Sequence, residues 1–124
     1  MRIISGRFKG TVLTSVGKGD ARAHLRPTTD RVRESIFNLL VNGAYGDPIS
    51  NVSVLDLFAG TGALGFEALS RGASFVRFVD NGRKAGSLIV QNAKTLLVQS
   101  EVELVQLDAL KLGFWKKEPF ALVF

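Results

Sequence analysis

From residue 53 onward, two kinds of apolar segment alternate along the chain. Short runs rich in valine, leucine and phenylalanine predict buried strands, and longer runs with apolar residues three and four positions apart predict helices. The predicted strands are 53–58, 75–79, 102–107 and 120–124, and the predicted helices are 63–71 and 85–98, with a helical turn at 109–112. Alternating strands and helices favour an α/β fold with a parallel sheet and right-handed crossovers.

A different pattern precedes this alternation. Residues 2–14 predict a short hairpin, because apolar and β-branched residues flank a turn with glycine at both ends. The polar, basic segment 15–27 contains glycine and proline and predicts a loop. The two predicted parts of the chain are an N-terminal extension at 1–48 and a Rossmann-like part at 49–124.

A helix follows the loop. Thr29 or Asp30 can cap its free N–H groups, and the helix should end near residue 42. Its predicted apolar face consists of Val32, Ile36, Leu39 and Leu40, with Arg31, Arg33 and Glu34 largely off that face.

The positive charge of the protein is concentrated near its N-terminus. The net charge is +5, and residues 1–34 contain eight basic and three acidic side chains, whereas the other 90 residues are balanced. A basic segment on a neutral body indicates a surface for a polyanion, most simply nucleic acid, or a solvated surface that serves solubility. Charge alone leaves both interpretations open.

Length and composition exclude several classes of protein. The 124 residues make at most one ordinary domain, and an apolar share of 46% suffices for a core. The lack of cysteine excludes disulfides and thiolate metal sites. We see no signal-peptide pattern and no apolar run near the roughly 20 residues that span a bilayer. We therefore expect a cytoplasmic protein, and we expect no metal site.

The segment from Val54 to Gly65 predicts a buried strand, a glycine-rich turn and the start of a helix. Glycine lets the backbone approach a ligand closely, and the N–H groups of a helix N-terminus point towards that ligand. Asp56 in this strand, and Asp80 and Asp108 after the next two, fall at the edge where parallel sheets bind ligands. One such aspartate is often only a cap or turn former. Three in succession favour a nucleoside site.

Two kinds of nucleotide fit this turn. Gly60-x-Gly62-x-x-Gly65 matches the dinucleotide fingerprint, and Asp80 lies where a ribose-binding acid is expected, so a NAD-dependent oxidoreductase is an alternative. Asp56 argues against it, because a carboxylate four residues before Gly60 would lie near the pyrophosphate. The same carboxylate suits a ligand with a cation and no phosphate at that point, such as S-adenosylmethionine.

Three segments resemble the RsmD family, which are bacterial 16S ribosomal RNA (guanine-N2) methyltransferases. They are DLFAGTGALGFEALSRGA at 56–73, RPTTDRVRESIFN at 26–38 and RIISG at 2–6. Many methyltransferases share the first, whereas all three in this order are specific to the family. The resemblance covers essentially the whole chain. It implies a Rossmann-like class I S-adenosylmethionine-dependent methyltransferase fold, with strand order 3-2-1-4 and an N-terminal hairpin and helix.

The resemblance also implies a role for each matching position. The residues that would hold S-adenosyl-L-methionine are Asp56, Phe58, Ala59, Gly60, Thr61, Gly62, Asp80, Asn81, Asp108 and Ala109. The residues that would meet phosphates of 16S rRNA, free or in the small ribosomal subunit, are Arg2, Arg7, Lys9, Arg26, Arg31 and Arg33. Asp56 would hold the methionine moiety, Asp80 the ribose hydroxyls and Asp108 the adenine. Phosphate contacts give affinity and position rather than sequence readout.

In this family the fourth strand leads into an (N/D)PPY motif, which binds the target amine and stacks on the flipped base. Residues 119–124 match that strand, so the motif would follow Phe124. We therefore expect the sequence to be truncated before its catalytic residues and the chain to be inactive alone. We also expect it to dimerise or aggregate through an exposed fourth strand. A non-catalytic RNA-binding module remains an alternative.

Overall fold

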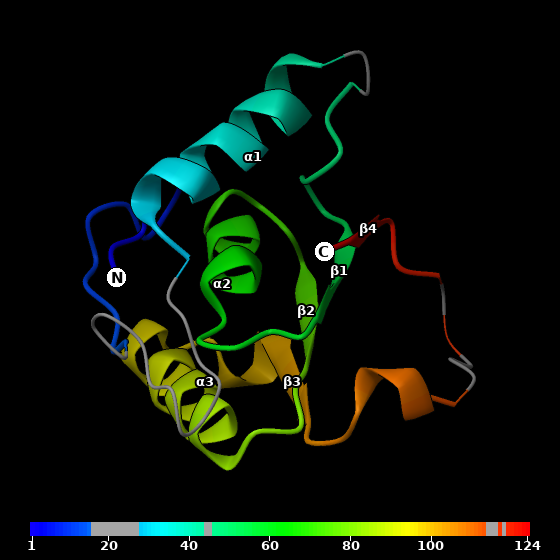
Figure 1. Ribbon diagram of the computed structural model, residues 1–124. Helices are drawn as coiled ribbons and strands as arrows, with labels where there is room; N and C mark the ends of the chain where they lie inside the picture. The colour runs from blue at the N-terminus through cyan, green and yellow to red at the C-terminus, as the bar shows by residue number, and fades with distance from the viewer. Residues whose placement is uncertain (16–27, 44–45, 114–116, 118) are drawn as a thin grey trace.

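The computed structural model describes residues 1–15, 28–43, 46–113, 117 and 119–124 (Figure 1). Its strands are β1 (Ser53–Leu57), β2 (Phe75–Val79), β3 (Val102–Val105) and β4 (Leu122–Val123). Its helices are α1 (Asp30–Asn42), α2 (Ala63–Ser70) and α3 (Arg83–Leu96), with 3-10 turns η1 (Gln99–Glu101) and η2 (Ala109–Lys111). None of the helices in these described segments combines the length and the apolar character that a membrane span requires.

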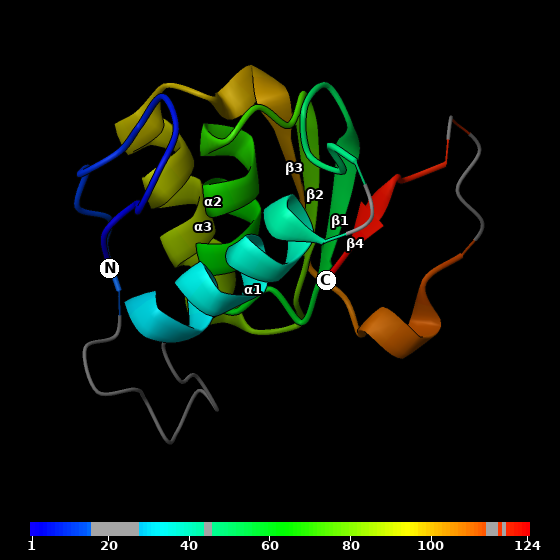
Figure 2. The same ribbon diagram turned by 90° about the horizontal axis from the view of Figure 1, so that it is seen from above.

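The four strands form one parallel sheet in the order β3-β2-β1-β4. This order confirms the predicted fold class. β1 and β2 pair along their whole length, from Ser53 opposite Phe75 to Leu57 opposite Val79. β4 pairs with β1 over only two residues. The three α-helices of the described residues lie on one side of the sheet (Figure 2). Because the strands are parallel, the turns that follow β1, β2 and β3 lie at one edge of the sheet.

The helix-facing side of the sheet carries the core. Alternation along the strands directs Val54, Val76 and Phe78 to this side, where all three are fully buried. The Phe78 ring packs on Phe66 of α2, with 4.7 Å between the ring centroids. A Cβ at Gly65 would lie 2.3 Å from the Phe78 ring, so only glycine allows α2 to approach the sheet this closely. The first turn of α2 is therefore fixed against β2.

The N-terminal extension forms the predicted hairpin, although it has a single antiparallel bridge, between Arg2 and Val12. It lies beside α2 and α3 (Figures 1 and 2). Two hydrogen bonds join the second strand of the hairpin to Asn92 of α3. The Thr14 N–H donates to the Asn92 Oδ1 at 2.8 Å, and the Asn92 Nδ2 donates to the Thr14 carbonyl at 3.0 Å. Ile3 is buried in the same core cluster as the sheet residues.

The predicted apolar face of α1 is wrong. Val32 and Leu39 are 50% and 73% exposed, whereas Arg33 and Phe37 are buried. The reason is that α1 packs on a polar partner: the Arg33 guanidinium lies 3.4 Å from the Glu67 carboxylate of α2. An apolar period along α1 cannot reveal an acid on another helix.

Candidate cofactor site and basic extension

The turn between β1 and α2 has an unusual backbone. Gly60 and Gly62 have φ angles of 58° and 84°, and Phe58, which is not a glycine, has a φ of 52°. Few side chains adopt this left-handed region, so the turn requires glycine at most of these positions. The Phe58 side chain is 69% exposed directly after β1. The turn therefore presents an aromatic ring and a glycine backbone at the carboxyl edge of the sheet.

Asp56 lies beneath this turn and is 2% exposed. One of its carboxylate oxygens accepts a hydrogen bond from the Gly65 N–H, in the first turn of α2, at 3.0 Å. Burial raises the pKa of Asp56 to about 8, the Gly65 hydrogen bond opposes this, and the charge of Asp80 adds to it. The described residues give Asp56 no cation partner. A cationic group beside this buried carboxyl would favour its ionised form.

Asp80 follows β2 and connects two turns. Its Oδ2 accepts a hydrogen bond from the Gly60 N–H at 2.9 Å, and its Oδ1 accepts one from the Gly82 N–H at 2.7 Å. An ionised carboxylate has about four acceptor positions, so about two remain for ligand hydroxyls. The structure therefore brings together the predicted Asp56, Asp80 and glycine turn at one edge.

The predicted adenine contacts lie after β3. The Asp108 Oδ1 accepts a hydrogen bond from the Leu110 N–H at 2.9 Å, so this side chain caps η2, and Ala109 is the first residue of that turn. Asn81 is exposed between β2 and α3. The described bond of Asp108 is the local capping bond, which leaves its second oxygen for a ligand.

Two contacts at the site have no signature in the sequence. The Thr61 hydroxyl, in the glycine turn, lies 3.7 Å from the Met1 sulfur, so the start of the chain touches the turn. The neighbouring Ala59 N–H donates to the Val79 carbonyl at 2.9 Å. Glu67 is fully buried in α2. In the sequence, Glu67 is a lone acid within a run of small and apolar residues, and this pattern is the one local sign that its side chain is buried.

The six predicted RNA contacts of the extension divide into four groups, of which the last is Arg33. The exposed ones are Arg2, Lys9 and Arg31. Arg7 is half exposed and pairs with Glu101 of η1 at 2.6 Å, so its charge is shared with a carboxylate. Arg26 lies outside the described residues. The hairpin and the start of α1 thus each present at least one exposed cation.

The structure corrects the prediction for Arg33. Its side chain is 1% exposed, and its guanidinium contacts the carboxylates of Asp30 and Glu67. Its Nη2 also donates to the Arg2 carbonyl. A guanidinium enclosed in this way cannot reach an RNA phosphate, so the predicted RNA contact of Arg33 is wrong.

Sequence comparisons place these features in a family. Residues 1–124 match the family model described as Conserved hypothetical protein 95. The chain is 36% identical to Ribosomal RNA small subunit methyltransferase D of Escherichia coli K12, over 100% of this chain and 58% of that protein. It is 41% identical to the protein of the same name from Haemophilus influenzae, over 90% of this chain and 55% of that protein.

A structural comparison agrees. The Escherichia coli protein yhhF superposes with a TM-score of 0.71 and 38% sequence identity, over 89% of this chain and 55% of that one. The chain spans about half the length of the curated relatives it matches. The sheet order and these neighbours together establish the fold of class I methyltransferases.

Proposed function

The chain belongs to the RsmD family of methyltransferases, and from that premise we propose that it supplies the S-adenosylmethionine-binding and RNA-facing part of a 16S rRNA (guanine-N2) methyltransferase. The names of its relatives support ribosomal RNA of the small subunit as the substrate. Methyl transfer is proposed for the full-length family enzyme. This chain spans about half the length of its relatives, and its proposed role is to bind the cofactor and the RNA.

One observation carries the cofactor assignment: two carboxyl groups, Asp56 and Asp80, flank the same glycine turn. In this proposal the methionine amino group supplies the cation that buried Asp56 lacks, and Asp80 accepts hydrogen bonds from the ribose hydroxyls. Asp108, with Ala109, faces the adenine. When bound, S-adenosylmethionine supplies a methyl group on an electron-poor sulfur. The protein residues bind and orient that donor.

The RNA assignment rests on the exposed cations of the extension. Arg2, Lys9 and Arg31 can each contact a phosphate without losing a described ion pair. Arg7 would exchange Glu101 for RNA. We retain the division of the chain into an RNA-facing extension at 1–48 and a cofactor-binding part at 49–124 as part of this proposal. A cytoplasmic location belongs to the same proposal.

Calorimetry with S-adenosylhomocysteine on Asp80→Ala tests the cofactor site. Loss of hydrogen bonds to a charged group should weaken binding by at least about tenfold, while affinity for a small-subunit rRNA transcript stays unchanged. Asp47→Ala is the matched control, because Asp47 also accepts hydrogen bonds from two backbone N–H groups, of Ile49 and Ser50, in a different loop. Unchanged affinity in Asp80→Ala, or binding of NADH in place of S-adenosylhomocysteine, would contradict the proposal.

A further inference from the structure

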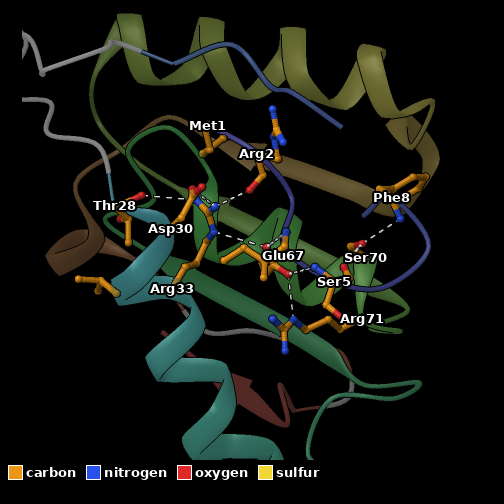
Figure 3. Close-up of polar contacts among 12 residues, drawn as sticks. Met1, Arg2, Ser5, Phe8, Thr28, Asp30, Arg33, Glu67, Ser70 and Arg71 are labelled. Carbon is orange, nitrogen blue, oxygen red and sulfur yellow. Dashed lines mark hydrogen bonds and ion pairs between the residues drawn. The ribbon is translucent and has the colours of Figure 1, made fainter. Parts of the chain in front are cut away.

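Glu67 stands at the junction of three elements. Its carboxylate accepts hydrogen bonds from the Ile4 and Ser5 N–H groups of the extension, at 2.9 and 3.1 Å. It also accepts one from the Arg71 Nε of its own helix at 2.9 Å and pairs with Arg33 of α1 at 3.4 Å. Figure 3 shows Ser5, Arg33 and Arg71 around the Glu67 carboxylate, which is fully buried. The hairpin and α1 are thus both attached to α2 through Glu67.

Arg33 completes the junction from the other side. Besides Glu67, its guanidinium donates to the Asp30 carboxylate at 2.6 Å and to the Arg2 carbonyl (Figure 3). The first turn of α1 and the first residues of the chain are therefore held by one side chain. The exposed cations Arg2 and Arg31 belong to these same two segments.

A buried ion pair of this kind is weak evidence for stability. Desolvation of two charges offsets much of their attraction, and well-packed apolar residues of similar size are often as stabilising. The pair of Arg33 and Glu67 instead joins α1 and the hairpin to α2 in one relative position. We therefore asked which functional part of the molecule depends on that position.

The glycine turn depends on the same elements. α2 begins at Ala63, directly after Gly62, and carries Glu67 one turn later. At the other end, the Met1 sulfur contacts the Thr61 hydroxyl of the turn. The glycine turn, α2 and the hairpin therefore contact one another in a closed circuit: the turn leads into α2, Glu67 of α2 binds the hairpin, and Met1 returns to the turn.

From this circuit we infer that Glu67 is a positioning residue, which couples RNA binding on the extension to cofactor binding in the glycine turn. The inference rests on the proposed function. Because α2 begins directly after the turn, a ligand that shifts the turn also shifts α2, and Glu67 transmits this shift to the cationic segments that it holds. The second ligand then meets segments that are already in the favoured position. Because coupling is reciprocal, each ligand must tighten the other by the same factor.

The experiment measures that factor on the 124-residue chain. We titrate a small-subunit rRNA transcript with and without saturating S-adenosylhomocysteine, and S-adenosylhomocysteine with and without RNA. We expect each ligand to tighten the other by about fivefold or more, equally in both directions. If Glu67 served stability alone, this factor would be the same in a variant that lacks its charge.

The test variant is Arg33→Met combined with Glu67→Gln. Glu67→Gln alone would leave the buried Arg33 guanidinium with the 60% exposed Asp30 as its one described carboxylate partner, so the double variant removes both charges of the buried pair. The amide oxygen at position 67 can still accept from the Ile4 N–H. We expect the double variant to fold, by circular dichroism, and to bind each ligand alone. The factor between the two ligands should fall to about one.

Glu101→Gln is the matched control. It makes the same chemical change in another glutamate that contacts the extension, through Arg7, but outside α2. Its coupling factor should equal that of the unchanged protein. A factor of one in the unchanged protein, with both ligands bound, would overturn the inference and leave the proposed function intact, as would an undiminished factor in the double variant. Failure to bind S-adenosylhomocysteine at all would overturn both.

Discussion

Asp56 illustrates how position in a strand sets the chemistry of one residue. Side chains alternate along β1, so Asp56 shares the helix-facing side with Val54 and is buried beneath α2. Burial raises the pKa of its carboxyl to about 8. Near neutral pH this carboxyl therefore keeps its proton until a cation approaches. In the proposed complex, cofactor binding releases that proton.

The pH dependence of stability tests this view of Asp56. Between its ordinary pKa of 3.8 and the folded value of about 8, the unfolded chain loses the proton and the folded chain keeps it. The contribution of Asp56 to the free energy of unfolding is therefore largest below pH 3.8. It decreases as the pH rises from 3.8 to about 8. The slope is at most about 1.4 kcal/mol per pH unit. Asp56→Asn removes this decline, so its stability relative to the unchanged protein should rise with pH.

Urea unfolding at a series of pH values measures the difference. Asp47→Asn serves as the control, because hydrogen bonds from Ser50, and then from Ile49, lower the pKa of the Asp47 carboxyl. With a lowered pKa, the contribution of Asp47 to stability is constant above the ordinary pKa of 3.8 and is lost only below it, so the difference curve of Asp47→Asn should be flat from about pH 5 to 8. A flat curve for Asp56→Asn as well would show that Asp56 is ionised in the folded protein.

Among the elements, the extension depends on a close approach to α2. The Arg7 N–H donates to the Ser70 carbonyl at 2.8 Å, and the Phe8 N–H donates to the Ser70 hydroxyl at 3.0 Å. Gly6 makes this possible: a Cβ there would lie 2.0 Å from the Ser70 carbonyl oxygen. The hairpin can therefore dock on the end of α2 only if position 6 has no side chain.

We predict that Gly6→Ala destabilises the protein more than Gly10→Ala. Both glycines have positive φ, 89° and 85°, so alanine meets similar backbone strain at each, about 1–2 kcal/mol. A Cβ at Gly10 meets nothing within 4 Å. The clash at position 6 should add about 1–3 kcal/mol, measured as a shift in the urea midpoint. Equal effects of the two variants would mean that the extension does not dock on α2.

Most elements could be predicted from sequence because their signals are local. Strand β2 agrees with its predicted range, and α1 begins after the Thr29 cap, whose hydroxyl accepts from the Val32 N–H. β3 and β4 are shorter than predicted, since β3 ends at Val105 and β4 contains only two residues. A strand ends where its partner ends, and that depends on neighbours that the local sequence does not specify.

The site could be predicted only in part for the same reason. Asp56, Asp80 and the glycine turn follow from strand ends in a parallel sheet, and the structure places them together. The resemblance implies an RNA contact for Arg33, and its position off the predicted apolar face of the helix agrees with that prediction, but the side chain is buried. Its buried partner Glu67 lies on another helix, which no pattern within α1 reveals.

At the scale of the whole molecule, the helices cover one side of the sheet and β4 forms one of its edges. All three α-helices cover one side of the sheet (Figure 2). The sheet order places β4 at one edge, where its described ladder is to β1 alone. Val123 of β4 is 54% exposed. An apolar edge strand is a template for pairing with another chain.

We therefore predict that the 124-residue chain associates with itself as its concentration rises, through β4. Val123→Lys should shift the chain towards monomer in sedimentation velocity, because a lysine on an edge strand opposes edge-to-edge pairing. Val90→Lys is the matched control, since Val90 is 44% exposed on α3, away from the edge. If both variants shifted the distribution equally, added charge alone would explain the effect. A monomer at all concentrations of the unchanged chain would show that β4 does not act as a pairing edge.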